Sequence, residues 1–524
     1  MVKMQRQHLH KALMIYVKIF HVLSKSLLFV FRCRIYIGRR PADVKAPSLI
    51  FFPVLPGQLN CGFAGLMTCR LPSQLSEKTA DRRLNSLWGK VKNGGLQNVP
   101  AGEKIAEHYL YGDDALHDMG MALSDLKCEA MQELLFFHAD RANALSNLAA
   151  EMKAFITNEE KLLEERAELI SSFDLEVINS RMLWFKDICW ILERDVLANL
   201  QKIRDLTGAE KNTEVTTAAF RKYRKLNFLL NALDRLEVRG RDSAGIQLAF
   251  VLKNEKAMTD VIRQIRENGL SEDYEQRTKK GDLLNLSIFV SANQGDAQAG
   301  TCVIFTYKTY SIIGELGRNV ADLRSSISND KVLKCFANEE TTCETTMTHT
   351  RWASVGAITE ENCHPVNNHT TGFLSSNDPL YPGASAQINV VLNGDIDNYT
   401  ALRQPLEHQG EIIARSITTD TKIIPLQIEK YLQLGKNLEE AFRLAVNDFE
   451  GSHAIAMTSN LEAGKMFLAL RGSGQAIYVG VNEDQYMFSS ELYGLVEVMP
   501  RFLKMNGEDG GQIFILDQKK GGGI

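Results

Sequence analysis

The sequence predicts a protein of the α+β class, in which a helical stretch and a strand-rich stretch follow one another. Between residues 71 and 225, apolar side chains recur at steps of three and four, which is the spacing of helices with one buried face. From residue 246 onward, short apolar runs alternate with Gly, Asn and Asp, which predicts strands joined by turns. With 524 residues, the chain is long enough for more than one domain or for a single fold with large insertions.

The composition argues against several classes of function. The hydrophobic content of 44% and the charged content of 24% are typical of a globular protein, and a net charge of −4 gives no reason to expect nucleic acid as a partner. The nine cysteines are scattered, with no CxxC pair and no Cys/His cluster at metal-ligand spacing. We therefore expect a cytoplasmic protein in a reducing compartment, with no disulfide framework, no metal and no cofactor.

Residues 1–60 form a basic, apolar leader. No acidic residue occurs before Asp43, and an apolar stretch from residue 13 to 31 is interrupted by Lys18, His21 and Lys25. A membrane-spanning helix needs about 20 predominantly apolar residues, so we predict no span and no membrane partner. A targeting peptide and an interfacial helix remain alternatives, but we interpret the leader as a poorly structured extension outside the functional protein.

The stretch from 71 to 225 is expected to be a helical module. Pro100 is the only proline between Pro72 and Pro365, which fits helices that are rarely broken. We expect Trp184 and Trp190 to belong to its core rather than to a ligand site. Two apolar stripes at helical steps support the helices: Leu145, Leu148, Met152 and Phe155, and then Ile188, Leu192 and Val196.

A strand-rich region follows. Leucines from Leu226 to Leu236 line one face of a helix that ends at Arg239-Gly240, and Asn319 to Ser328 predict another helix. The stretch from 254 to 284 is charged, and we expect it to be irregular. The alternating or buried apolar runs predict strands at 246–251, 286–290, 302–306 and 388–392.

Residues of types that can act in catalysis or binding occur at four separate positions. Cys61 heads a small-residue turn, although a lone Cys-Gly is more often packing than chemistry. Arg351 offers a planar fork that matches a carboxylate, with a structural salt bridge as the alternative. Asn393-Gly394 at a strand end is either a simple turn or an oxyanion site, and Asp420 lies at the head of a helix, where capping is the alternative.

Taken in order, five motifs resemble those of class II glutamine amidotransferases, and the nearest pattern is the glutaminase domain of glutamine:fructose-6-phosphate aminotransferases. The motifs are Cys61–Gly65, Arg239–Gly245, Thr348–Ala353, Asn393–Tyr399 and Thr419–Thr421. The resemblance implies an amino-terminal-nucleophile hydrolase fold, a four-layer αββα sandwich. On this basis, residues 61–70 and 226–520 form the amidotransferase domain, and residues 71–225 are an insertion after its first strand.

The resemblance also implies roles for these residues. Cys61 would attack the amide of L-glutamine, with its own α-amine as the base, and Asn393 and Gly394 would stabilise the oxyanion. The remaining roles concern substrate binding: Arg351 would hold the carboxylate of glutamine, Asp420 its ammonium group, and Trp352 would belong to a mobile loop that closes over it. Ser354 is a further substrate-binding residue, which keeps the hydroxyl of the threonine that is common in the family.

The sequence departs from the family pattern in several ways. Val355 and Leu392 stand where the family commonly has histidine, so glutamine affinity is expected to be weaker. Cys61 has an acylated amine unless the Asn60–Cys61 bond is cleaved or the chain starts later. The chain ends at Ile524, where the family continues into sugar-phosphate isomerase domains, so we expect the acceptor domain or subunit to lie outside this chain.

The sequence therefore predicts the glutaminase half of an enzyme that makes glucosamine 6-phosphate from fructose 6-phosphate. Two alternatives remain open: another class II amidotransferase, such as the one that forms phosphoribosylamine, and a catalytically silent regulatory or assembly module. Homo-oligomerisation is possible in each case.

Overall fold

The computed structural model describes residues 61–68, 79–99, 105–279, 285–292, 300–311, 314–370, 386–408, 413–481, 485–499, 501–508 and 510–520. These residues all belong to one unit, 59–524. The basic leader, with its predicted lack of a membrane span, lies outside them. Among the described residues, no helix is both long and apolar enough to cross a membrane.

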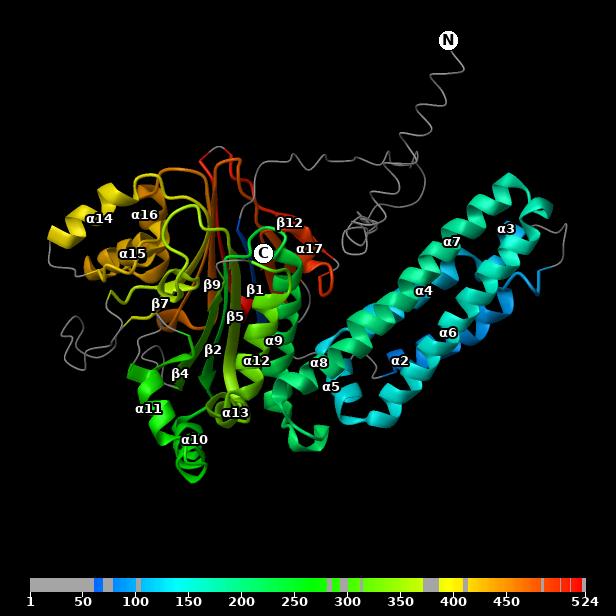
Figure 1. The fold of residues 1–524 in the computed structure, drawn as a ribbon, viewed down its shortest axis with the longest axis horizontal. Coiled ribbons are helices and arrows are strands. Elements are labelled where there is room, and N and C mark those ends of the chain that lie inside the picture. The colour runs from blue at the N-terminus through cyan, green and yellow to red at the C-terminus, as the bar shows by residue number, and fades with distance from the viewer. Residues whose placement is uncertain are drawn as a thin grey trace, which may run out of the picture. The chain divides into compact units, whose positions relative to one another are not determined.

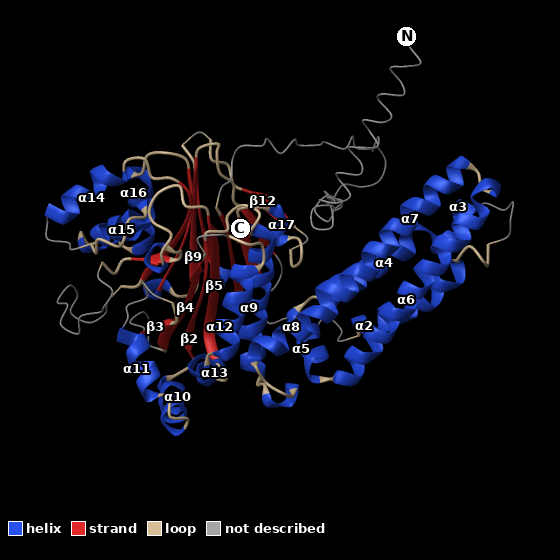
Figure 2. Cartoon of the chain, viewed as in Figure 1, coloured by secondary structure: helices blue, strands red, loops and turns tan. Residues whose placement is uncertain are grey.

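Two antiparallel sheets form the centre of the fold (Figure 2). The larger sheet has the strand order β12-β10-β11-β1-β5-β2-β4-β3, and the smaller has the order β13-β9-β8-β7-β6. The eight strands of the larger sheet are β1 (Gly62–Thr68), β2 (Ser243–Leu252), β3 (Ser287–Ala292), β4 (Thr301–Tyr310), β5 (Thr341–Arg351), β10 (Tyr478–Val481), β11 (Gln485–Ser489) and β12 (Phe502–Lys504). The five strands of the smaller sheet are β6 (Val366–Asn367), β7 (Ile388–Gly394), β8 (His453–Ser459), β9 (Lys465–Arg471) and β13 (Gln512–Asp517).

The two sheets pack face to face through a shared apolar layer. Phe63 and Phe488 from the larger sheet contact Val391, Ala456 and Leu468 from the smaller one in a single buried cluster. The alternation of side chains along each strand places one set in this layer and the other set against the outer helices. All ten residues of β2 are buried. Because both faces of this strand are covered, its sequence is a nearly continuous apolar run.

Helices cover the outer face of each sheet (Figure 1). On the larger sheet, Leu229 and Leu233 of α9 (Thr217–Leu236) share a core with Ala64 and Leu66 of β1, and α12 (Arg318–Asn329) and α13 (Lys331–Ala337) lie alongside. On the smaller sheet, α15 (Ile423–Gln433) and α16 (Leu438–Asp448) bury Ile424 and Phe442 against β7 and β8. Helices α14 (Tyr399–His408) and α17 (Leu492–Leu495) complete this part of the chain. The predicted four-layer αββα sandwich of the α+β class is confirmed.

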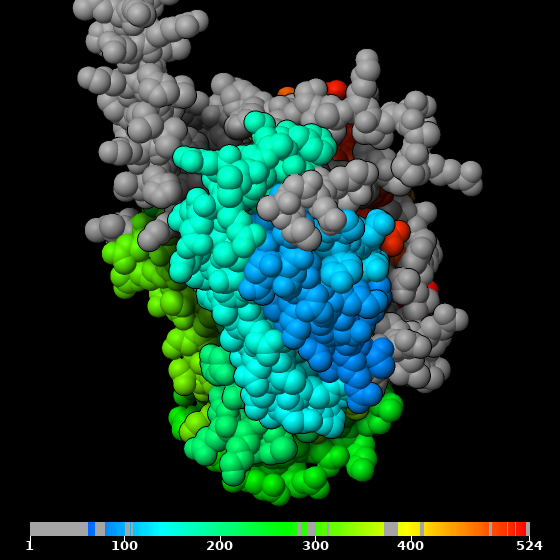
Figure 3. Space-filling model, turned by 90° about the vertical axis from the view of Figure 1, so that its right-hand side faces the viewer, coloured from blue at the N-terminus to red at the C-terminus, as the bar shows by residue number. Residues whose placement is uncertain are grey.

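The stretch between β1 and α9 is helical, and its blue and cyan residues lie together in the space-filling view (Figure 3). Trp88 stacks on Phe185 with ring centroids 5.6 Å apart and meets Phe155 edge-on at 5.3 Å. Leu145, Leu148 and Met152 are buried, as their helical spacing predicted. The helices are α2 (Ala80–Val91), α3 (Ile105–His108), α4 (Gly112–Leu126), α5 (Glu129–Phe137), α6 (Ala139–Arg166), α7 (Ser172–Ile191) and α8 (Ala198–Thr207), with a π-helical turn at Leu192–Leu197.

One expectation about local structure is wrong. The described part of the stretch from 254 to 284 is not irregular, because it forms α10 (Glu255–Glu267) and α11 (Ser271–Lys279). The side chain of Asn254 caps α10 by accepting a hydrogen bond from the Ala257 backbone N–H at 3.0 Å. Val261 and Ile265 lie on the buried face of α10, while its other face carries the charges that suggested irregular structure.

Candidate active site

Cys61 directly precedes β1, at the end of the central strands of the larger sheet. Its half-buried Sγ accepts a hydrogen bond from the backbone N–H of Trp352, at 3.2 Å. Burial raises the pKa of the Cys61 thiol to about 11; Arg351 acts against this rise, while Asp395 and Asp420 add to it. The thiol is therefore neutral near pH 7, and it needs a nearby base before it can act as a nucleophile.

Close backbone packing fixes the position of Cys61. Gly62 pairs with Thr350 of β5, and the Thr350 hydroxyl donates a hydrogen bond to the carbonyl of Gly240 at 2.5 Å. A Cβ atom on Gly240 would lie 2.5 Å from the carbonyl carbon of Arg351, so only glycine permits this approach. The glycine of the Arg239–Gly245 motif thus brings the corner after α9 against the end of β5.

Arg351 is the last residue of β5, and its side chain is 3% exposed. Its guanidinium donates hydrogen bonds to the carbonyls of Val355 and, at 2.9 Å, Ala357 in the loop that follows. In the described part of the chain, no carboxylate forms an ion pair with Arg351. A buried guanidinium without a carboxylate partner is costly unless an anion binds there, which argues against a structural salt bridge.

Asn393 and Gly394 end β7 in the smaller sheet. Gly394 has a φ of +88°, and a Cβ atom there would lie 2.1 Å from the carbonyl oxygen of Ser452, so both the conformation and the space require glycine. Asn393 is buried, and its Oδ1 has no hydrogen-bond partner among the described residues. Because the oxygen and nitrogen of an amide are exchanged by a simple flip, the unpartnered position can equally present an N–H donor.

Asp420 begins the 3-10 turn that leads into α15, and it is 5% exposed. Its carboxylate accepts hydrogen bonds from the backbone N–H groups of Ile396, at 2.9 Å, and Thr421, at 2.8 Å. Burial raises its pKa, and the neighbouring Asp395 adds to this effect. The hydrogen bond to Ile396 joins Asp420 to the segment after Gly394, so its carboxylate does more than cap its own helix.

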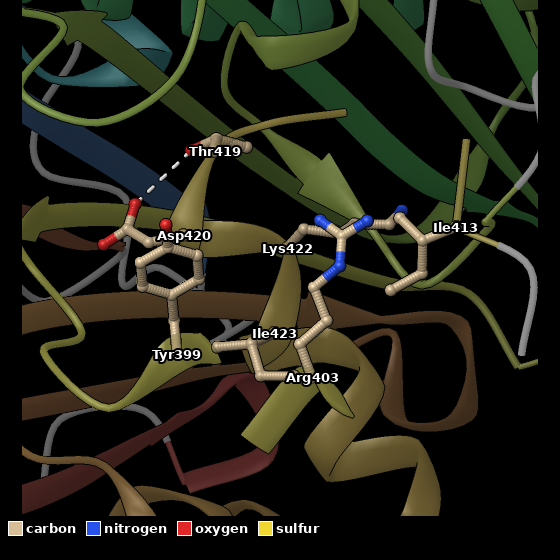
Figure 4. Close-up of a pocket in the computed structure, with 7 residues that line it drawn as sticks. All are labelled: Tyr399, Arg403, Ile413, Thr419, Asp420, Lys422 and Ile423. Atoms are coloured by element: carbon tan, nitrogen blue, oxygen red, sulfur yellow. Dashed lines mark hydrogen bonds between the residues drawn. The ribbon is translucent and has the colours of Figure 1, made fainter. Parts of the chain in front are cut away.

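A small cavity adjoins Asp420 on the side of α14 and α15 (Figure 4). In the close-up, the Asp420 carboxylate turns toward Thr419, whose hydroxyl donates a hydrogen bond to it at 3.4 Å. The cavity is lined by Tyr399, Arg403, Ile413, Thr419, Asp420, Lys422 and Ile423.

The sequence analysis did not single out two buried histidines, His349 and His364, or Asn362. His349 Nε2 lies 2.8 Å from the carbonyl oxygen of Leu392 and 3.2 Å from His364 Nδ1, and His364 Nε2 lies 2.9 Å from the Thr421 hydroxyl. Burial lowers the pKa of His349 to about 3 and that of His364 well below its usual value, so both rings are neutral. The pair therefore connects β5, β7 and the turn of Asp420 without carrying charge.

Asn362 supports the same turn from a different side. Its side-chain oxygen accepts hydrogen bonds from the backbone N–H groups of Thr418, at 2.8 Å, and Thr419, at 2.9 Å. The polar run Asn362-Cys363-His364 was the available signal in the sequence, but nothing local indicated which segments these side chains contact.

The structure thus brings the predicted site residues together from three segments. Cys61 and Arg351 come from the larger sheet, Asn393 and Gly394 from the smaller sheet, and Asp420 from the turn that precedes α15. Trp352 and Ser354 lie in the loop after β5; the Trp352 side chain is 39% exposed, and the Ser354 hydroxyl donates a hydrogen bond to Asp395 Oδ1 at 2.7 Å. Leu392, which replaces a family histidine, packs in the core between the smaller sheet and its helices.

Part of the chain is similar to a known family of domains. Residues 369–497 match the family described as "Glutamine amidotransferase domain". The chain contains a class II glutamine amidotransferase domain.

Two curated relatives of the chain share the name of one specific enzyme. It is 36% identical over 169 residues to the glutamine–fructose-6-phosphate aminotransferase (isomerizing) of Methanothermobacter thermautotrophicus, covering 32% of this chain and 25% of the relative. It is 35% identical over 162 residues to the protein of the same name from Acidithiobacillus ferridurans, covering 31% and 23%. The match therefore spans about a quarter of the length of these relatives.

Among solved structures, the glutamine phosphoribosylpyrophosphate amidotransferase from B. subtilis aligns with a TM-score of 0.30 and 16% identity, over 53% of this chain and 49% of that one.

Proposed function

We propose that this chain hydrolyses L-glutamine at Cys61 and releases ammonia. The observation that carries the proposal is the charge pattern around the thiol: Arg351, buried without a carboxylate partner, and the buried carboxylate of Asp420 both act on Cys61. Glutamine presents one carboxylate and one ammonium group, and these two side chains supply the complementary charges. Residues 61–70 and 226–520 would make up the domain, with residues 71–225 as an insertion.

The chemistry proceeds in two covalent steps. A base takes the proton of the Cys61 thiol, the sulfur attacks the side-chain amide carbon of glutamine, and the Asn393 amide and the Gly394 N–H stabilise the resulting oxyanion. Collapse of this intermediate breaks the C–N bond, and ammonia leaves with the transferred proton. Water then hydrolyses the thioester to glutamate and restores the thiol. The loop with Trp352 and Ser354 covers the bound glutamine.

The base in this proposal is the α-amine of Cys61 itself. An α-amine titrates near pH 8, so an appreciable fraction is unprotonated at neutral pH. An amide nitrogen cannot serve, so the active form must lack the Asn60–Cys61 bond. Amino-terminal sequencing combined with a glutaminase assay tests this: we expect glutamate release only from protein whose first residue is Cys61. An uncleaved bond together with full activity, or a free Cys61 terminus without activity, would contradict the proposal.

We further propose that the ammonia aminates a sugar phosphate, with fructose 6-phosphate as the acceptor and glucosamine 6-phosphate as the product. The support is the name shared by the curated relatives. The acceptor would bind a sugar-phosphate isomerase domain or subunit, and the reaction would take place in the cytoplasm. Coupled assays with fructose 6-phosphate, alone and with a separately supplied isomerase subunit, would detect glucosamine 6-phosphate. Glutamate release without amino sugar in both assays would remove this acceptor from the proposal.

A further inference from the structure

The loop after β5, residues 352–357, begins beside the Cys61 thiol. The Trp352 backbone N–H donates to Cys61 Sγ at 3.2 Å, and the Ala353 N–H donates to Asp242 Oδ2 at 2.9 Å. Both of these contacts attach the loop to the larger sheet, from which it emerges. They hold the beginning of the loop, but they do not connect it with the oxyanion corner at Asn393-Gly394 in the smaller sheet.

One side-chain contact makes that connection. The Ser354 hydroxyl donates a hydrogen bond to Asp395 Oδ1 at 2.7 Å. Asp395 is the residue directly after Gly394, so this bond ties the middle of the loop to the corner that would carry the oxyanion donors. Asp395 is half-buried.

Other contacts hold the rest of the loop and place its end near Asp420. The Arg351 guanidinium donates hydrogen bonds to the carbonyls of Val355 and, at 2.9 Å, Ala357. The Ala357 N–H donates to the Thr418 hydroxyl at 2.9 Å, and a Cβ atom on Gly356 would lie 2.8 Å from the Thr419 nitrogen. The loop is therefore held at its start, middle and end against three different segments. Only the Ser354–Asp395 contact among these joins two side chains, so it can be removed without disturbing the backbone.

We propose that Ser354 and Asp395 are positioning residues, whose hydrogen bond latches the 352–357 loop in its closed position over Cys61 and against the Asn393-Gly394 corner. This inference rests on the proposed glutaminase function. Glutamine would bind productively only under the closed loop, so the latch sets the fraction of protein that is ready to bind. Neither residue needs to touch the reacting atoms.

The test measures two properties in protein whose first residue is Cys61. The first is the rate at which iodoacetamide alkylates Cys61, followed by peptide mass mapping, because an open loop exposes the thiol. The second is the KM and kcat of the glutaminase reaction. We expect Ser354→Ala and Asp395→Ala each to raise the alkylation rate and the KM by factors whose product is about tenfold, because the first follows the open fraction and the second the inverse of the closed fraction. The kcat should be nearly unchanged, since saturating glutamine closes the loop.

Conservative variants separate a hydrogen bond from other effects. Ser354→Thr keeps the hydroxyl and Asp395→Asn keeps an acceptor oxygen, so both should stay within about threefold of the wild type. The double variant Ser354→Ala/Asp395→Ala should be no worse than either single one. Asp205→Ala is a matched control, because Asp205 Oδ1 also accepts a hydrogen bond of 2.7 Å from a neutral side chain, that of Gln201 in α8, away from the thiol.

Two results would overturn the latch. One is a Ser354→Ala protein with wild-type alkylation rate and KM. The other is an Asp395→Asn protein that is as impaired as Asp395→Ala while Ser354→Ala is normal, which would mean that the carboxylate acts through its charge on glutamine. Failure of the proposed function would give a different result. Glutamine would not be hydrolysed, and adding it would not slow the alkylation of Cys61. The alkylation rates of the variants would still show whether the Ser354–Asp395 hydrogen bond holds the loop.

Discussion

Two buried polar clusters lie beside the C-terminal half of α9, and they differ in how far their groups satisfy one another. At the junction with the helical stretch, Glu497 accepts hydrogen bonds from Asn199 of α8 at 2.6 Å, Asn231 of α9 at 2.9 Å and Arg235 of α9 at 2.5 Å. Burial works against the charge of Glu497, but Arg235 outweighs it, so the pKa of this carboxyl is lowered. Donors cover both oxygens of Glu497, and the Arg235 guanidinium has a carboxylate partner, although its Nη1 has no hydrogen-bond partner among the described residues.

The cluster around Cys61 is incomplete by comparison. The Arg351 guanidinium has carbonyl partners but no carboxylate within the described chain, and Asn393 Oδ1 has no partner there. Buried polar groups are normally paired, so groups left over at one place indicate a site for a bound molecule. The comparison teaches that burial of polar groups alone does not mark an active site. What distinguishes the candidate site, within the part of the chain that the structure describes, is a buried guanidinium without a carboxylate, together with an unpartnered amide oxygen, in the cluster around the Cys61 thiol.

The largest expected effect concerns the complete cluster. Glu497→Ala should lower the free energy of unfolding by about 3–5 kcal/mol, because Arg235 and the two asparagine amides lose their common partner in the interior. Glutaminase kcat should stay close to wild type below the unfolding temperature. Denaturant unfolding and steady-state kinetics on the same protein check both points. Glu497→Gln, which keeps one acceptor oxygen, should lose less stability than Glu497→Ala.

At the Asn393-Gly394 corner we expect the reverse, a large loss of activity with little loss of stability. Asn393→Ala should lower glutaminase kcat by about two to three orders of magnitude, since one oxyanion donor is lost, with little change in the unfolding midpoint. Kinetics and thermal unfolding measure the two effects. Undiminished glutaminase activity in this variant would refute the assignment of Asn393.

Arg351→Lys should have a somewhat smaller effect, mainly on substrate binding. A lysine keeps the charge but cannot present two parallel donors to a carboxylate, so we expect KM for glutamine to rise by about 30- to 100-fold. Competition by L-glutamate, measured as an inhibition constant, should weaken in parallel. If Arg351 were only structural, Arg351→Lys would lower the unfolding midpoint and leave KM unchanged.

The smallest effect concerns the neutral histidines between the two sheets. The folded-state pKa of His349, about 3, lies below the ordinary value of 6.5, so below pH 6.5 the unfolded state binds a proton that the folded state does not. Stability is fully present above pH 6.5 and falls as the pH drops toward 3, by about 1.4 kcal/mol per pH unit for each such histidine. Urea unfolding at pH 7.0 and 5.5 measures the loss, which should shrink in His349→Gln. An equal loss in that variant would show that other groups cause it.

The sequence predicted those residues of the candidate site that stand in local motifs. Cys61, Arg351 with Trp352, Asn393-Gly394 and Asp420 each stand in a short run with its own chemical meaning, and the structure brings the four positions to one place. The strands were also foreseeable, since alternating apolar residues report burial directly.

The residues that could not be predicted act through contacts between segments that are distant in the sequence. Asn362 and His364 act by bonding to the turn before α15 and to β5, and no periodicity reveals such partners. The same is true of Asp395, which sequence reasoning treated only as part of a motif. Helix α10 was missed because its charged face outnumbers the few apolar residues that bury against the sheet.

The most direct test of the central claim is calorimetric titration of L-glutamine into Cys61→Ala protein, which can bind but not turn over its substrate. We predict measurable binding that Arg351→Lys in the same background abolishes or weakens by at least about 30-fold, and that Glu497→Gln leaves intact. Binding that is equally strong in all three proteins, or absent from the Cys61→Ala protein itself, would contradict the claim that the unpaired charges around Cys61 form a glutamine site.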